Sequence, residues 1–369
     1  MEPRVAELAR ILRPAAGGIH VVSTGVDSQL AVQRRLYGTD DAGAIQDAFR
    51  GALERIAGAR GVLLGVPSDV GAGFVRGANF GPQAVRAAVL DAQPDWPRWA
   101  ESAGLVDIGD VFVVPQLLHD DMLSEAQKRA TRRAIYPDLM DDEAERLPVS
   151  PLSIAERALD LALAINPAAK VFVIGGDHSC AWPAVSALSR ARRDRWSIVQ
   201  PDAHTDLLAE RLGVKYCFAT WSYHANELLG RDGRMVQVGI RATRRDRAHW
   251  ESTLGVRQFW AEECRADPAR TIDAIIRHLR DVRAESVYFS NDIDGTDASV
   301  ADATGTPEPS GLAPDFLIAL IRRLGEEIGL CGGDIMEVAP PLARDGDQTL
   351  GLAARYLTET IAAALGRPA

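Results

Sequence analysis

Aspartate and histidine side chains alternate along one stretch of the sequence, Asp202-Ala203-His204-Thr205-Asp206. In an extended segment, alternate side chains point to the same side, so these three can converge on one point. Similar side chains follow apolar runs at two other places, upstream in Gly175-Gly176-Asp177-His178 and downstream in Asp292-Ile293-Asp294. We therefore expect three strand ends to supply ligands to one metal centre. The six candidate ligands are His178, Asp202, His204, Asp206, Asp292 and Asp294.

This ligand set suits a pair of divalent cations. Four carboxylates and two imidazoles favour two ions such as Mn²⁺, and Ni²⁺ also accepts such ligands. Structural zinc sites prefer closed sets of cysteine and histidine, so the set fits them poorly. Without cations, crowded carboxylates repel and raise one another's pKa. A water molecule shared by two bound ions becomes a hydroxide nucleophile near neutral pH.

Each candidate ligand taken singly has an ordinary structural explanation. An aspartate after a strand commonly caps a helix or closes a turn, and Asp177 also fits that description. A single histidine is more often a surface or core residue than a ligand. Three clusters at corresponding positions after apolar runs are difficult to explain as caps, so we favour the metal centre.

The elements that must position these residues alternate regularly from residue 150 onward. Apolar runs predict strands, and helical spacing predicts helices between them. Such alternation indicates a mostly parallel sheet in an α/β fold, in which ligands bind beyond the carboxyl ends of the strands. The expected strands are 61–66, 106–114, 171–174, 196–199, 236–240, 287–290 and 330–338. The expected helices are 82–90, 154–165, 182–193, 271–282, 316–328 and 349–365.

The first 58 residues predict a helical extension that precedes a catalytic domain of residues 59–369. Helical spacing occurs at 5–12 and 42–56, with a polar, irregular segment around Tyr37 between them. We expect this extension to pack against the domain or to form an oligomer contact. Residues 115–150 carry many charges and little clear periodicity, which indicates a long, partly helical insertion.

Composition narrows the classes of protein that fit. The net charge of −10 disfavours a nucleic-acid partner, because such partners require a concentrated basic surface. No apolar run approaches the roughly 20 residues of a membrane helix. The beginning of the chain lacks the apolar stretch of a signal peptide, and the four cysteines suggest no disulfide framework. These features lead us to expect a cytoplasmic protein.

Several motifs resemble those of the ureohydrolase family, which includes arginase, agmatinase and related guanidino hydrolases. The three clusters, read as Gly175–Ser179, Asp202–Asp206 and Ser290–Asp294, are similar to its three signatures. Further similarity lies in Gly65-Val66-Pro67, Phe80-Gly81-Pro82, Thr304–Pro309 and Glu337–Pro341. The resemblance implies a three-layer αβα sandwich with a mostly parallel sheet, two manganese ions held by the six candidate ligands, and a homo-oligomer, trimeric or hexameric. It also implies that Glu308 binds the substrate guanidinium. A carboxylate can accept two parallel N–H hydrogen bonds from this planar cation.

The family pattern fails after the second signature, in the aromatic segment Tyr216–His224. Cys217 falls where the family carries a histidine, which argues against arginine as the substrate and leaves the proton shuttle open. His224 is a candidate for that shuttle, with a helix surface as its alternative place. Trp221 and Tyr223 could stack on a planar cation, although ordinary loop packing is the preferred explanation for either ring taken singly. The segment is thus agmatinase-like but atypical, and it also resembles that of guanidine hydrolases.

The reaction that we expect is hydrolysis of a C–N bond in a guanidino compound, releasing urea and an amine or ammonia. Guanidine, a methylated guanidine, agmatine and guanidino acids are candidate substrates, with Cys217, Trp221, Tyr223 and Glu308 as substrate contacts. Asp206 is expected to bridge the metals and accept the proton of the attacking water. Two alternatives remain open: a catalytically silent partner subunit, and a metal-dependent deacetylase that hydrolyses an amide.

Overall fold

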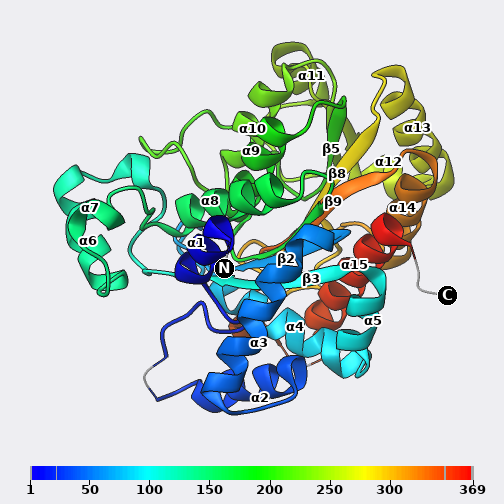
Figure 1. The fold of residues 1–369 in the computed structure, drawn as a ribbon. Helices are drawn as coiled ribbons and strands as arrows, with labels where there is room; N and C mark the ends of the chain where they lie inside the picture. Colours follow the sequence, from blue (N-terminus) through cyan, green and yellow to red (C-terminus); the bar gives the residue numbers. More distant parts are fainter. Residues whose placement is uncertain (1, 22, 345, 367–369) are drawn as a thin grey trace.

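The computed structural model describes residues 2–21, 23–344 and 346–366, and its centre is a nine-stranded sheet (Figure 1). The strands lie in the order β1-β3-β2-β4-β9-β8-β5-β6-β7. Strands β1 and β3 pair antiparallel, whereas the other paired strands run parallel. The strands are β1 (Leu12–Arg13), β2 (Gly61–Val66), β3 (Leu105–Val111), β4 (Lys170–Gly175), β5 (Trp196–Pro201), β6 (Met235–Ile240), β7 (Arg257–Trp260), β8 (Ser286–Asp292) and β9 (Leu330–Met336).

Helices cover both faces of this sheet and complete the expected three-layer αβα sandwich (Figure 1). Helices α1, α8, α9 and α10 lie over one face, and α4, α13, α14 and α15 lie over the other. The helices are α1 (Pro3–Ile11), α2 (Val26–Tyr37), α3 (Ala42–Glu54), α4 (Gly81–Ala92), α5 (Trp96–Ala103), α6 (Glu125–Ile135), α7 (Asp141–Ala144), α8 (Pro151–Ile165), α9 (Trp182–Ala191), α10 (Trp221–Leu229), α11 (Arg247–Leu254), α12 (Ala261–Ala266), α13 (Pro268–Asp281), α14 (Pro314–Glu327) and α15 (Thr349–Leu365). None of the described helices combines the length and apolar character that crossing a membrane requires.

Alternation of side chains along the strands produces two hydrophobic cores. In β4, Val171 and Val173 pack into the core under α8 and α9, whereas Phe172 and Ile174 pack into the core under α14 and α15. Because both faces are covered, the central strands are apolar at successive positions, as parallel strands usually are. This explains why short, continuous apolar runs marked the strands in the sequence.

The N-terminal segment packs directly against the sheet layer. Leu8 of α1 and Phe49 of α3 are fully buried in the same core as β2 and α8. Strand β1 extends the sheet by pairing with β3. These contacts show that α1, α3 and β1 pack on the sheet layer, and the division of the chain into an extension and a domain at residue 58 stays a prediction.

Some elements differ from the expectation. An irregular segment was predicted around Tyr37, but the structure has a helix, α2, that ends there. The sequence did not indicate this helix because its apolar stripe is short: only Val32 and Gln33 are buried on it. The aromatic segment of residues 216–224 was expected to be a loop, but its second half is the start of α10. The insertion of residues 115–150 is partly helical, as predicted, and contains α6 and α7. Strand β7 was missed because it is only four residues long.

Candidate metal centre

Four adjacent strands bring the three clusters together. Strands β4, β9, β8 and β5 are neighbours at the middle of the sheet and run parallel, so their carboxyl ends meet at one edge. His178 begins a short 3-10 helix just beyond β4, Asp202 directly follows β5, and Asp292 ends β8. The order of the strands, which crosses between distant parts of the sequence, thus creates the centre.

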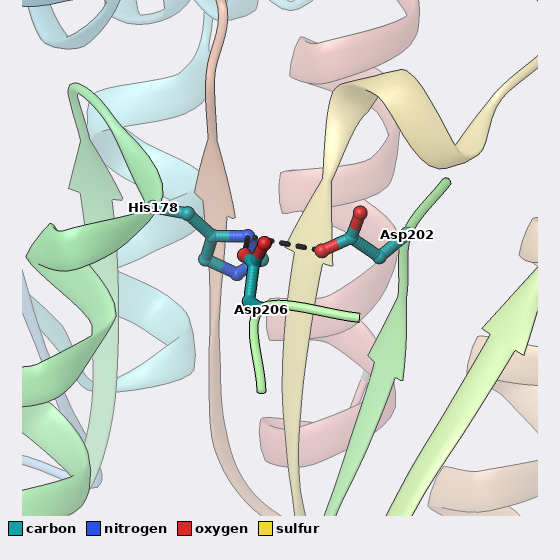
Figure 2. A group of neighbouring side chains, drawn as sticks. All are labelled: His178, Asp202 and Asp206. Carbon is teal, nitrogen blue, oxygen red and sulfur yellow. Dashed lines mark ion pairs between the residues drawn. The ribbon is translucent and has the colours of Figure 1, made fainter. Parts of the chain in front are cut away.

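One group of possible ligands consists of His178, Asp202 and Asp206, whose side chains face one another in Figure 2. Their ligand atoms lie within 4.8 Å of one another. His178 Nδ1 is 3.3 Å from Asp202 Oδ2 and 3.5 Å from Asp206 Oδ2. All three residues are buried, so their charges have little access to water.

A second group consists of Asp202, His204 and Asp294. His204 Nδ1 lies 3.0 Å from Asp294 Oδ2 and 3.7 Å from Asp202 Oδ1. Asp202 therefore belongs to both groups, whereas Asp206 belongs to one. Asp202 presents Oδ2 to His178 and Oδ1 to His204, so it is the carboxylate that the two groups share, and the bridging role expected of Asp206 stays a prediction.

Asp292 completes the set beside the first group. Its Oδ2 lies 2.9 Å from His178 Nδ1, and its Oδ1 accepts a hydrogen bond from the Asp294 backbone N–H at 2.9 Å. The structure thus brings all six predicted ligands to one place. Four buried carboxylates and two imidazoles in this arrangement fit divalent cations, which would neutralise charge that the chain leaves crowded.

Burial and neighbouring charges shift the pKa values of these groups. Burial, and then the charge of Asp202, raise the pKa of Asp206 well above its ordinary value. Burial, and then Asp294, do the same to the pKa of Asp292. Burial lowers the pKa of a histidine, but Asp202 and Asp292 outweigh it at His178 and raise its pKa. In the same way, Asp294 and Asp202 raise the pKa of His204 to about 12. The chain without cations therefore holds protons at the positions where cations would bind.

Trp221, at the start of α10, contacts this centre through both its ring and its N–H. Its Nε1 donates a hydrogen bond to Asp206 Oδ2 at 3.0 Å, and its ring stacks on His178 with centroids 4.4 Å apart. The side chain is fully buried. This placement corrects the idea that Trp221 stacks on a substrate, because no face of a buried ring is open to a ligand.

Two residues that the candidate set omitted also hold the ligands. Glu337, which follows β9 and has a φ of 61°, accepts a hydrogen bond from the His178 backbone N–H at 2.9 Å. Gln200 donates from Nε2 to Asp202 Oδ2 at 2.7 Å. A sequence signal existed for both: Gln200 adjoins the second signature, and Glu337 begins one of the family-like segments.

Glu308 lies at the edge of the second group. Its Oε1 is 3.7 Å from His204 Nε2, and its side chain is partly exposed. Arg241 fixes the backbone around it, donating to Glu308 O at 2.8 Å, to Pro309 O at 3.0 Å and to Asp294 O at 2.7 Å. One guanidinium thus ties the Glu308 loop to a ligand loop, which sets the distance between the two.

A small cavity of about 100 Å³ opens beside the centre. Thr306 and Glu337 line it, and these residues contact Asp294 and His178 respectively. Phe74, Arg211 and Phe218 line it farther out, with the Arg211 guanidinium 4.8 Å from the Phe218 ring centroid. The cavity therefore adjoins two residues that contact candidate ligands, while the residues that line it include neither Glu308 nor any of the six candidate ligands.

The other predicted substrate contacts lie around the start of α10. Cys217 is buried, and burial raises the pKa of its thiol. The Tyr223 hydroxyl accepts a hydrogen bond from Arg231, whose guanidinium also covers the Tyr223 ring. His224 packs against Tyr216 and Trp182, with its Nε2 3.0 Å from Lys215 O. These contacts already engage Tyr223 and His224, and their roles in binding or proton transfer stay predictions.

Comparison with known proteins agrees with this geometry. The arginase family model matches residues 59–363. The chain belongs to the arginase family. It is 31% identical over 308 residues to a guanidinobutyrase of Pseudomonas aeruginosa, covering 81% of this chain and 84% of that protein. It is also 31% identical over 282 residues to an N(1)-aminopropylagmatine ureohydrolase of Thermus thermophilus, covering 76% and 83%.

Solved structures of the same family share the fold. A proclavaminate amidino hydrolase from Streptomyces clavuligerus superposes with a TM-score of 0.63 at 28% identity, covering 83% of this chain and 92% of that one. An agmatine ureohydrolase of Thermoplasma volcanium has a TM-score of 0.61 at 26% identity, covering 84% and 90%. As a member of the arginase family in its agmatinase-like branch, the protein is a hydrolase of C–N bonds in guanidino compounds.

Proposed function

We propose that this arginase-family enzyme hydrolyses a small guanidine, either guanidine itself or a methylated guanidine, to urea and ammonia or an amine. The observation that carries the proposal is the size of the cavity beside the centre, about 100 Å³. Because a water molecule occupies roughly 30 Å³ in the liquid, such a space suits a substrate of few heavy atoms. Guanidine has four heavy atoms and carries no tail that the cavity would have to admit.

The chain's own residues supply binding and proton transfer. The Glu308 carboxylate accepts paired N–H bonds from the planar guanidinium and turns its carbon toward the ligand groups. Trp221 holds Asp206 Oδ2, which leaves Oδ1 to accept a proton from the attacking water. That proton then passes to the departing nitrogen, so that guanidinium and water yield urea and ammonium.

The six candidate ligands would hold two divalent cations, with Mn²⁺ expected and Ni²⁺ as the alternative. Bound there, two such ions lower the pKa of a water molecule and act as Lewis acids. One group that would hold an ion consists of His178, Asp202 and Asp206, with Asp292 beside it, and the other consists of Asp202, His204 and Asp294. We also propose that the enzyme is cytoplasmic. We further propose that it forms a trimer or hexamer, and light scattering on the purified protein would test this oligomeric state.

The test of the proposal is urea release. Protein loaded with Mn²⁺ or Ni²⁺ is assayed with guanidine, methylguanidine, agmatine, 4-guanidinobutyrate and arginine, and we expect the highest kcat/KM with guanidine or methylguanidine. Glu308→Gln should lower that kcat/KM about 10- to 100-fold, because a charged hydrogen-bond partner contributes roughly 1.5–3 kcal/mol. Glu210→Gln, which neutralises an exposed carboxylate next to Arg211 in the sequence, should leave kcat/KM unchanged. Release of urea from none of the five compounds would refute the proposal.

A second candidate substrate is a guanidino acid, which one observation favours. Arg211 places an exposed cation at the mouth of the cavity, where it could pair with a substrate carboxylate and repel the ammonium of agmatine. The Pseudomonas aeruginosa relative is named a guanidinobutyrase. If 4-guanidinobutyrate proves the best substrate, Arg211→Ala should weaken its kcat/KM while leaving that of guanidine in place.

A further inference from the structure

Three glutamines form a continuous row across one half of the sheet. Gln200 of β5, Gln237 of β6 and Gln258 of β7 pair directly with one another in the strand register. All three are fully buried. Because parallel strands in a covered sheet are normally apolar, three buried amides in register call for an explanation.

The amides are linked into a chain of hydrogen bonds that ends on a metal-ligand candidate. Trp260 Nε1 donates to Gln258 Oε1 at 3.0 Å, and Gln258 Nε2 donates to Gln237 Oε1 at 2.9 Å. Gln237 Nε2 donates to Gln200 Oε1 at 2.9 Å, and Gln200 Nε2 donates to Asp202 Oδ2 at 2.7 Å. The chain therefore runs from β7, at the edge of the sheet, to Asp202 at its centre.

The two ends of the chain determine its direction. An indole N–H can only donate, and an ionised carboxylate can only accept. Each amide between them must therefore accept on the side of Trp260 and donate on the side of Asp202. The dipoles of all three amides then point the same way, and aligned hydrogen bonds of this kind strengthen one another in a buried setting.

We propose that this amide chain positions Asp202, the carboxylate shared by both ligand groups. Its final bond holds Oδ2, while the His204 backbone N–H holds Oδ1 at 2.6 Å. With both oxygens held, the carboxylate plane keeps one orientation, which sets where two ions lie relative to each other. Gln200, Gln237 and Gln258 are positioning residues, acting through Asp202. The inference rests on the two-ion part of the proposed function and is independent of the substrate.

A purely structural role for the glutamine row makes a different prediction. If the row only joins strands, its loss should lower the free energy of unfolding and leave metal affinity unchanged. Asn226 offers a matched comparison, because it is a fully buried amide on α10 whose Nδ2 donates to Leu254 O instead of toward the centre. Gln237→Leu and Asn226→Leu each remove one buried amide, and only the first interrupts the chain. Gln237 Nε2 also donates to Thr205 O at 2.6 Å, within the ligand segment, so Gln258→Met, which leaves that bond in place, separates the effect of the chain from this local contact.

The experiment measures Mn²⁺ affinity by competition with a chelating dye, alongside Tm. Gln237→Leu should weaken Mn²⁺ binding about 10- to 100-fold, the range seen when partners of metal ligands are removed. Asn226→Leu should lower Tm but keep the wild-type affinity. Gln258→Met, at a position three hydrogen bonds away from Asp202 that touches no ligand candidate, should weaken Mn²⁺ binding in the same direction by a smaller factor. It also serves as the test if Gln237→Leu does not fold.

The direction in which the amides donate their hydrogen bonds provides an independent check on the proposed positioning of Asp202. Gln258→Glu keeps an acceptor for Trp260 and the side-chain volume. When ionised, its carboxylate presents an oxygen to Gln237 Oε1 and breaks the amide chain, whereas the protonated carboxyl donates its O–H to that oxygen and keeps the chain intact. Its Mn²⁺ affinity relative to wild type at the same pH should therefore fall once the pH is high enough to ionise the buried carboxyl, and should stay close to wild type below that pH. Wild-type affinity in both Gln237→Leu and Gln258→Met, or an equal loss in Asn226→Leu, would overturn the proposal. If the variants that break the amide chain weaken Mn²⁺ binding but the wild-type enzyme releases no urea, the substrate proposal is refuted. The proposal that the amide chain positions Asp202 then stands.

Discussion

Asp206 is held at both its backbone and its side chain by the same helix. Its φ of 52° lies in the left-handed region, which costs a residue other than glycine of order 1–3 kcal/mol. Its carbonyl accepts a hydrogen bond from the Tyr223 N–H at 3.2 Å, and its carboxylate accepts one from Trp221 at 3.0 Å. The start of α10 thus maintains a strained conformation that aims Asp206 at His178.

This arrangement leads to a prediction for Trp221→Phe. The substitution keeps an aromatic ring against His178, and it removes the N–H that holds Asp206 together with part of the buried indole ring. We expect Mn²⁺ affinity and kcat each to fall about 10- to 100-fold, because the ligand loses its orienting partner. Dye competition and the urea assay measure the two quantities.

Trp182→Phe is the matched control for that substitution. Trp182 is also buried and stacks on Tyr216, but its Nε1 has no hydrogen-bond partner among the described residues. Removal of this N–H should leave Mn²⁺ affinity and kcat close to wild type. An equal loss in both variants would show that the ring environment matters and that the bond to Asp206 does not.

At the scale of elements, one buried arginine joins α4 to β3. Arg86 Nη1 donates to Asp110 Oδ1 at 2.6 Å, and its Nε and Nη2 donate to Asp107 at 2.9 and 3.0 Å. Arg86 and Asp110 are 3% and 1% exposed, so neither charge can be solvated if its partner is lost. Burial raises the pKa of Asp110, and Arg86 opposes that rise.

Arg86→Met should therefore destabilise the fold strongly. Loss of one partner from a buried ion pair costs about 3–5 kcal/mol, because the other charge stays buried. The exposed pair between Arg35 of α2 and Asp91 of α4 serves as the control, and Arg35→Met should cost less than about 1 kcal/mol. Urea denaturation monitored by circular dichroism gives both values, and similar costs for the two variants would contradict the prediction.

At the scale of the whole molecule, the metal centre links stability to pH. Asp206, Asp292, His178 and His204 all have raised pKa values in the metal-free fold, so this fold binds more protons than the unfolded chain does. Stability that depends on such protons is present at low pH and declines as pH rises toward the folded-state pKa. For His204 the window runs from about 6.5, the ordinary histidine value, to about 12.

Metal binding should reverse this decline, because cations replace the protons. We expect the Tm of metal-free protein to fall between pH 6.5 and pH 8.5, and the Tm increase caused by Mn²⁺ to grow over the same range. Thermal unfolding with EDTA and with Mn²⁺ at three pH values measures both. A Mn²⁺ effect on Tm that is the same at every pH would argue against proton displacement at these ligands.

Local patterns in the sequence were sufficient to predict much of the architecture and the ligand set. The strands around the centre are short and apolar at successive positions, and His178, Asp202 and Asp292 each follow or end one of them. Parallel strands place their carboxyl ends together, so the type and position of these residues already indicated a shared site. Helix α2 escaped prediction because its buried stripe is short. The start of α10 escaped prediction although Trp221, Ala225 and Leu229 form a buried stripe, because its aromatic residues were interpreted as substrate contacts.

The partners of the ligands depended on contacts between segments far apart in the sequence. Strand order places β5 between β8 and β6, and this order aligns Gln237 and Gln258 with Gln200 and directs their chain to Asp202. Folding of residues 216–224 turns Trp221 inward to Asp206, where the sequence had suggested a ring open to substrate. Residue type and spacing specify which side chains can bind a metal. Which side chains orient them is specified by long-range packing, which no local pattern records.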